Sequence, residues 1–313
     1  MKHPPRQPVD AHGPHSPRRP PRLLLHGLLW SVAFIFLLPL VWMFTTSLMP
    51  EERSTSASLS PLPALIDDQG RPLSILEPRY YGALAEQAAD NYSQVMQTPV
   101  ADFRRYLRNS VIVAALSVSG MTISSAVAAY GFARIRWKGR DLLFTLVLAT
   151  MMIPFTVVMA PQYLLFKHLD WIGTFRPLWI PAWFGGAFSI FLLRQFFLGI
   201  PRELDEAARI DGCGHFGIFC RIILPLSRPA LTVVALLQFI WCWNEFVQPL
   251  IFLNHQDMYT AALGLQMFQS QHGGVPWTIV MAACVIIVLP IILVFLLAQR
   301  TLVQGIATQG LKE

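Results

Sequence analysis

The residues best able to do chemistry lie in one polar stretch, residues 201–228, between two long apolar segments. Acids crowd its start, where the dipole of a helix favours carboxylates. These acids are Glu203, Asp205 and Glu206. Gly212 and Gly214 follow, and glycine permits sharp backbone turns. The pattern predicts a helix, a glycine turn and a second short amphipathic helix that Pro225 ends. Such a unit cannot bury its apolar faces alone, so we expect it to dock on a partner, its own bundle, or both.

Motifs for catalysis are absent from the sequence. There is no phosphate-binding G-x-x-x-x-G-K-[ST], no H-E-x-x-H and no G-x-S-x-G. The spacing of Cys213 and Cys220 matches no usual zinc pattern. We therefore expect no catalytic residue, no metal site and no cofactor in this chain.

One acid stands out within the apolar segments, Glu245 in the run W-C-W-N-E-F. An acid inside a membrane is costly to bury, so it is functional by default. The alternative is that Glu245 lies near the outer interface or forms hydrogen bonds within the bundle. Trp241 is a further candidate for lining a solute pathway, because aromatic rings stack on sugars, but tryptophans also populate membrane interfaces. Asn244 and Gln248 are better candidates, because a lipid-facing amide would lack partners.

The composition is that of an integral membrane protein. Of 313 residues, 54% are hydrophobic and 13% charged, against roughly 25% charged in soluble domains. The net charge of +6 is interpreted through the positive-inside rule, and we expect no nucleic-acid partner.

Hydropathy predicts an all-α, polytopic membrane protein with six transmembrane helices. The expected spans are 23–49, 110–132, 142–166, 178–198, 230–253 and 278–297. Basic residues in alternate loops place both termini in the cytoplasm. Pro154 and Pro161 should interrupt the third span. In the second span Gly120, Ser124 and Ala128 recur every four residues, which favours close helix packing.

The chain divides into five parts. Residues 1–22 are expected to be a disordered basic cytoplasmic tail. Residues 23–49 exceed a signal-peptide core of about 7–15 residues and form the first transmembrane helix. Residues 50–107 form an extracytoplasmic loop or subdomain, with a short helix within 84–96. Residues 108–299 form the core transmembrane domain, with its polar stretch at about 201–228, and 300–313 a cytoplasmic tail.

The polar stretch resembles the EAA signature of the membrane subunits of ABC importers. That pattern is E-A-A, three residues, G, nine residues, then I-x-L-P. The matching residues are Glu206, Ala207, Ala208, Asp211, Gly212, Ile222, Leu224 and Pro225. The runs M-M-I-P, F-L-L-R-Q-F-F and W-N-E-F look like the carbohydrate branch of this family, and most like the smaller membrane subunit of maltose-type importers.

The resemblance implies a type I ABC importer permease fold in a bacterial cytoplasmic (inner) membrane. The chain would form half of the translocation path of a binding-protein-dependent sugar importer. Its implied partners are a second homologous permease subunit, two ATP-binding subunits that hold ATP and Mg²⁺, and an extracytoplasmic solute-binding protein. Glu206 and Asp211 would make polar contacts in a cleft of the ATPase, and Gly212 would permit the turn.

Four alternatives to a sugar importer are considered from the residues. The solute of such an importer could be another small molecule, such as glycerol phosphate. A secondary transporter would usually show internal repeats and ion-coupling acids in the membrane. A DNA-binding helix-turn-helix in the polar stretch would need an excess of bases, whereas acids and bases balance there. A membrane enzyme would need a nucleophile or metal constellation.

Overall fold

The computed structural model describes residues 22–51, 65, 73–97, 102–270 and 277–309. The predicted N-terminal tail, much of the long first loop and the last four residues lie outside this range. The chain separates into two units, Met1–Trp42 and Met43–Glu313, each described by itself. The described residues form helices and connecting segments without a strand, which confirms the all-α prediction.

The first unit contributes most of α1 (Arg22–Ser47), which is apolar on all sides. The second unit begins in the last turn of α1 and holds the other elements. These are α3 (Pro78–Gln97), α4 (Phe103–Arg134), α5 (Arg140–Ala149), η1 (Thr150–Met152), α6 (Phe155–His168), α7 (Arg176–Trp179), η2 (Ile180–Phe184), α8 (Ala187–Gly199), α9 (Glu203–Ile210), α10 (His215–Ile218), η3 (Phe219–Ile223), α11 (Leu224–Leu226), α12 (Arg228–Asn244), α13 (Val247–Phe252), η4 (Gln256–Met258), α14 (Ala261–Ser270) and α15 (Trp277–Gln309).

Four described helical segments are long and apolar enough to cross a membrane, and six if each bent pair of helices counts as one span. The two bent pairs are Arg140–Met152 with Phe155–His168, and His215–Leu226 with Arg228–Asn244. The six predicted spans correspond to these six segments. The described part therefore agrees with a polytopic membrane protein.

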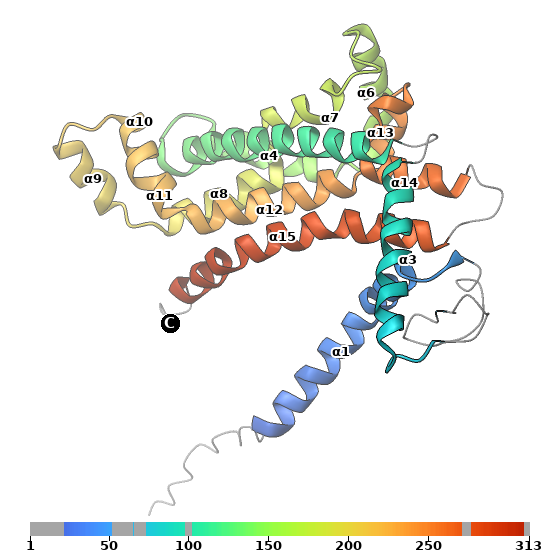
Figure 1. The fold of residues 1–313 in the computed structure, drawn as a ribbon. Coiled ribbons are helices and arrows are strands. Elements are labelled where there is room, and N and C mark those ends of the chain that lie inside the picture. Colours follow the sequence, from blue (N-terminus) through green and yellow to red (C-terminus); the bar gives the residue numbers. More distant parts are fainter. Residues whose placement is uncertain (1–21, 52–64, 66–72, 98–101, 271–276, 310–313) are drawn as a thin grey trace, which may run out of the picture. The chain divides into compact units, whose positions relative to one another are not determined.

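The long helix α4 is the centre of the second unit. It packs along α8 and α12, and α12 in turn contacts α15 (Figure 1). Gly120 lets the Trp183 indole from η2 lie against the α4 backbone, and Trp183 Nε1 donates to Leu116 O at 3.1 Å. Ser124 Oγ donates to Ala182 O at 3.2 Å. Small residues on α4 thus create the close packing that their spacing predicts.

The third span differs from the prediction. The chain bends by 100° between η1 and α6, and Pro154 is the residue before α6. Ile153 is extended at φ −85° and ψ 113°, because a residue before proline is pushed out of the helical region. Pro161 lies inside α6 without ending it, so its predicted interruption was wrong. In a membrane, neighbouring groups can satisfy the freed carbonyl of such a proline.

The fifth span is not continuous to residue 253 as predicted. Helix α12 ends at Asn244, and Glu245 is extended at φ −65° and ψ 123° before α13 begins. The following segment, expected to be a loop, contains α14. The helix expected within 84–96 is present and longer, as α3.

Two asparagines fix the end of the second unit that carries α3, α13 and α14 (Figure 1). Asn91 Nδ2 donates to Ser47 O and Met49 O at 2.8 and 3.0 Å. Asn109 Nδ2 donates to Asp257 O and Tyr259 O at 2.9 and 3.0 Å. These bonds satisfy backbone carbonyls at or just beyond the end of α1 and within or just beyond η4.

Candidate coupling site

Helix α9 and the turn after it lie at the other end of the second unit, beyond the ends of α4 and α8 (Figure 1). The carbonyl of Arg202 starts the helix by accepting from the N–H groups of Asp205 and Glu206 at 2.9 and 3.1 Å. The first turn carries three acids and the last turn carries Arg209. Both distributions complement the helix dipole. The helix that the acids predicted is therefore present, as the eight residues of α9.

Gly212 ends α9 in the left-handed conformation, at φ +82°. Its N–H donates to Arg209 O at 3.0 Å, and the N–H of Cys213 donates to Ala208 O at 2.9 Å. This pair of bonds is a Schellman motif, in which glycine is favoured because the turn needs a positive φ. Gly214 has φ −75° and caps α10 in an extended conformation. Of the two glycines, therefore, only Gly212 is needed for the sharp turn.

The face of α9 that lies away from the bundle is exposed. Of the predicted coupling residues, Glu206, Ala207, Asp211 and Gly212 are exposed, whereas Ala208 is buried. Two apolar side chains beside them are also exposed, Ile210 by 87% and Phe216 by 80%. Such exposure of large apolar side chains next to carboxylates is typical of a protein-docking surface.

The segment after the turn packs inward. Ile218 and Ile223 are fully buried against residues of α4 and α8, while Ile222 and Leu224 are half-buried. Helix α10 passes through a π-helical turn, η3, into α11. Pro225 was predicted to end this helix, but it lies in the first turn of α11, and the chain bends by 77° into α12 after Leu226. Proline is tolerated there because a first-turn N–H needs no helical partner.

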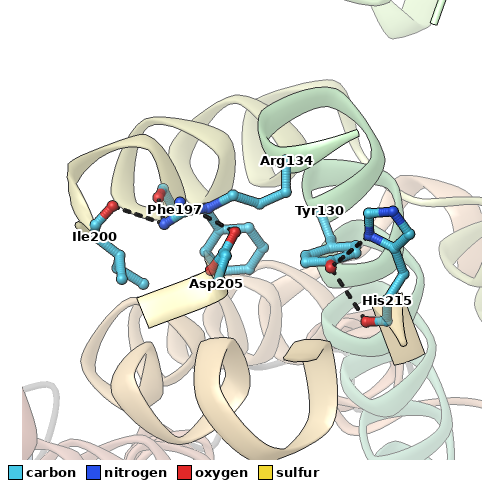
Figure 2. Close-up of polar contacts among 6 residues, drawn as sticks. All are labelled: Tyr130, Arg134, Phe197, Ile200, Asp205 and His215. Carbon is cyan, nitrogen blue, oxygen red and sulfur yellow. Dashed lines mark hydrogen bonds and ion pairs between the residues drawn. The ribbon is translucent and has the colours of Figure 1, made fainter. Parts of the chain in front are cut away.

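A buried ion pair attaches α9 to the bundle (Figure 2). Arg134 Nη1, at the end of α4, lies 3.4 Å from Asp205 Oδ2, and the two side chains are 2% and 7% exposed. Arg134 Nη2 also donates to Phe197 O and Ile200 O, at 2.6 and 2.8 Å. One guanidinium therefore joins the end of α4, the end of α8 and the first turn of α9.

A second polar contact fixes the other side of the turn. Tyr130 OH lies 3.2 Å from His215 Nδ1 and donates to His215 O at 3.1 Å (Figure 2). The Tyr130 ring also lies against the Phe219 ring, with centroids 5.0 Å apart. Helix α4 thus contacts both helices flanking the glycine turn, through Arg134 and Tyr130.

The sequence alone did not indicate the Arg134–Asp205 ion pair or the Tyr130–His215 contact. Asp205 was interpreted through the helix dipole only, and Arg134 as one of several loop arginines marking the cytoplasmic side. One signal was available, since Arg134 follows the predicted apolar span 110–132 by only two residues, and an arginine that is buried there requires a partner. Tyr130 and His215 gave no such signal.

The four residues predicted to line a solute pathway do not share one cavity. Trp241, Glu245 and Gln248 border a space of about 10 Å³, enough for a single water molecule. Asn244 is exposed, and its Nδ2 donates to Ile240 O at 2.8 Å in its own helix. Glu245 Oε1 accepts from the N–H of Gln248 at 3.0 Å and so caps α13. Glu245 thus has a hydrogen bond within the bundle.

The fold and this site together define a helical protein with membrane-spanning segments and an exposed, acid-rich helix at one end, and the described residues hold no cluster of metal-binding side chains. The chain belongs to the family described as binding-protein-dependent transport system inner membrane component, whose profile matches residues 120–308. Members of this family are permease subunits and not enzymes, and the chain is a component of the inner membrane.

Similar proteins are known by sequence and by structure. The trehalose/maltose transport system permease protein MalG of Thermococcus litoralis is 38% identical over 71% of this chain and 81% of its own length. The arabinooligosaccharides transport system permease protein AraQ of Halalkalibacterium halodurans is 35% identical over 71% and 79%. A chain of a bacterial ABC transporter involved in the import of the acidic polysaccharide alginate has the same fold, with TM-score 0.73 and 22% identity over 89% of this chain and 95% of that one.

Proposed function

We propose that the chain is the permease subunit of an ATP-dependent, binding-protein-dependent sugar importer, coupled to its ATPase through α9. The observation that carries the coupling role is the exposed, acid-rich α9, capped by Gly212 and held at its base by the Arg134–Asp205 pair. Family membership supports the permease role. The oligosaccharide solutes in the names of two relatives support the sugar.

The proposed assembly contains this chain, a second homologous permease subunit, two ATP-binding subunits and an extracytoplasmic solute-binding protein. ATP and Mg²⁺ belong to the ATP-binding subunits, and this chain holds no cofactor. Both termini and α9 face the cytoplasm, and α13 and α14 lie toward the outside. The basic residues near α9 support this orientation through the positive-inside rule.

Docking would use the exposed side chains of α9 and its turn. Glu206 and Asp211 offer carboxylates, and Ile210 and Phe216 offer apolar surface to a cleft in the ATP-binding subunit. Interfaces of this kind combine a few buried apolar anchors with a polar rim. Ala207 and Gly212 would allow close approach, because neither presents a long side chain.

Coupling would follow from the rigidity of this attachment. When ATP closes the ATPase dimer, each docked α9 moves with it. Asp205 transmits that displacement to Arg134, and Arg134 to the carbonyls of Phe197 and Ile200. Helices α4 and α8 then rock together with α9, which alternates access to the path between the two permease subunits. The exposed Trp241 and Asn244, with Glu245 and Gln248, remain our candidates for contact with the solute.

The coupling role can be tested by introducing a charge into the docking surface. Ile210→Glu should leave the chain inserted in the membrane but reduce co-purification of the ATP-binding subunits. Ile75→Glu is a matched control, because Ile75 is also exposed but precedes α3, far from α9 in the sequence. Equal retention of the ATP-binding subunits by wild type and Ile210→Glu would contradict the docking role.

The solute can be tested in proteoliposomes that contain the assembled complex. ATPase activity should be stimulated by the binding protein loaded with oligosaccharides, such as maltodextrins or arabino-oligosaccharides. Glycerol phosphate is the matched non-sugar solute. Stimulation by glycerol phosphate and by none of the sugars would overturn the sugar assignment while leaving the coupling role intact.

A further inference from the structure

A polar cavity of about 400 Å³ lies between the end of α4 and α9. Four arginines border it, two from α4 and the loop after it and two from the α9 segment. They are Arg134, Arg136, Arg202 and Arg209. Two acids, Asp205 and Glu206, border it as well. The cavity is therefore formed at the same junction that attaches the docking helix to the bundle.

The charges around this cavity do not balance. Arg134 and Asp205 neutralise each other as a buried pair. In the part of the chain that the structure describes, the other three arginines form no ion pair within 4.0 Å. Three guanidinium groups against the single carboxylate of Glu206 leave two positive charges around the cavity. Unpaired guanidinium groups converging on a polar cavity favour an anion with several oxygen acceptors.

The cavity also lies near the ends of two candidate membrane spans, where the phosphates of lipid headgroups are found. Arg134 is the last residue of one candidate span, and Gly199, three residues before Arg202, is the last residue of another. Trp137, in the loop beside Arg136, is 40% exposed, and tryptophan is enriched at membrane–water interfaces. Basic pockets at the cytoplasmic ends of membrane helices attract the phosphates of anionic lipids.

We propose that this cavity binds the phosphate group of an anionic phospholipid. The assignment to the cytoplasmic leaflet rests on the orientation given under the proposed function. Arg136 and Arg202 contact the phosphate from opposite sides, the first from the loop after α4 and the second from the N-terminus of α9. A bound headgroup thus braces the docking helix against the bundle and makes coupling dependent on lipid composition.

Retention of lipid by the purified full-length chain tests this proposal. Native mass spectrometry would count phosphatidylglycerol and phosphatidylcholine kept by wild type and by Arg136→Gln/Arg202→Gln. Each arginine is expected to contribute about fivefold to the affinity for an anionic lipid, so the double variant should lose roughly 25-fold. Retention of phosphatidylcholine should not change.

Arg221→Gln/Arg228→Gln is the matched control. It removes the same charge from two exposed arginines of the same polar stretch that do not border the cavity. This control should keep phosphatidylglycerol as wild type does. Undiminished phosphatidylglycerol in the test variant, or an equal loss in the control, would overturn the proposal.

Two further arms separate the lipid from other anions. In the first, inorganic phosphate is titrated into the wild-type chain in phosphatidylcholine nanodiscs, and it should not bind. Phosphate binding that Arg136→Gln/Arg202→Gln abolishes would instead assign the cavity to a soluble anion. A test variant that keeps its lipid but loses the ATP-binding subunits would assign the cavity to an acidic protein segment. Loss of the ATP-binding subunits by Ile210→Glu, with lipid unchanged, would show that docking and lipid binding are separate.

Discussion

The guanidinium of Arg134 and the carboxylate of Asp205 pair 3.4 Å apart, with only 2% and 7% of the two side chains exposed. Each group has one atom without a partner among the described residues, Nε of Arg134 and Oδ1 of Asp205. A buried ion pair is weak evidence for stability, but removing one partner leaves the other charge uncompensated. The pair therefore makes the position of α9 dependent on the end of α4.

Asp205→Asn should weaken this attachment. The guanidinium of Arg134 would then be buried without a carboxylate and would donate only to the carbonyls of Phe197 and Ile200. We expect the free energy of unfolding to fall by about 3 kcal/mol. Uptake should fall more than ATPase activity. Asp141→Asn is the control, because Asp141 pairs with Arg140 at 2.9 Å but is 76% exposed. Solvent screens such a surface pair, so its loss should leave the stability almost unchanged. Equal melting-temperature shifts for the two variants would contradict a structural role for the buried pair.

Gly212→Ala should strain the turn after α9, because its φ of +82° disfavours a Cβ even though nothing lies within 4 Å of that position. We expect a cost of about 1 kcal/mol and partial uncoupling. Gly214→Ala has equal space and an ordinary φ, so it should have no such effect. Hydrogen exchange at the amides of Gly212 and Cys213 would report the loosened cap.

Gly212→Pro should have a larger effect, since proline fixes φ near −65° and has no N–H to bond Arg209 O. We expect the protein to insert normally while uptake is lost and ATPase activity of the complex persists. Normal uptake by this variant would show that coupling does not need the rigid turn.

Gly120→Ala should disturb the contact between α4 and η2. The new methyl would overlap the Trp183 indole and displace its hydrogen bond to Leu116 O. Overpacking of this kind costs about 1–3 kcal/mol. Gly131→Ala on the same helix meets nothing within 4 Å and should be neutral or slightly stabilising. Thermal unfolding of the two variants in the same detergent is the measurement, and identical midpoints would refute the packing role of Gly120.

Asn109→Ala should loosen the segment around η4, whose carbonyls at Asp257 and Tyr259 would lose their donor. Each of these part-buried hydrogen bonds contributes about 0.5–1.5 kcal/mol, so we expect a loss of about 1–3 kcal/mol. Amides of residues 256–261 should exchange faster. Ser119→Ala removes only a bond within α4 itself, to Ala115 O, and should leave those amides unchanged.

Composition and periodicity were sufficient to predict the helical class, the six apolar segments and the glycine turn after α9. Each depends on local chemistry, such as the length of an apolar run or the positive φ at Gly212. The break at Pro154 was also predicted, whereas Pro161 shows that proline alone does not decide where a membrane helix ends.

The attachment of α9 was not predicted, because it joins residues far apart in the sequence. Arg134, Phe197 and Asp205 meet only when α4, α8 and α9 converge, and no local pattern encodes that convergence. Similarly, the break at Glu245 interrupts an apolar run without a proline or glycine at that position.

The π-helical turn at Phe219–Ile223 has a consequence for the rotational alignment of the helices on either side of it. Such a turn holds one residue more than an α-helical turn, and each α-helical residue advances the chain by about 100°. If the same residues formed regular α-helix instead, the extra residue would rotate everything N-terminal to it by about that angle relative to α12. His215 would then face away from Tyr130, and the docking helix would point in a new direction although every residue in it was unchanged.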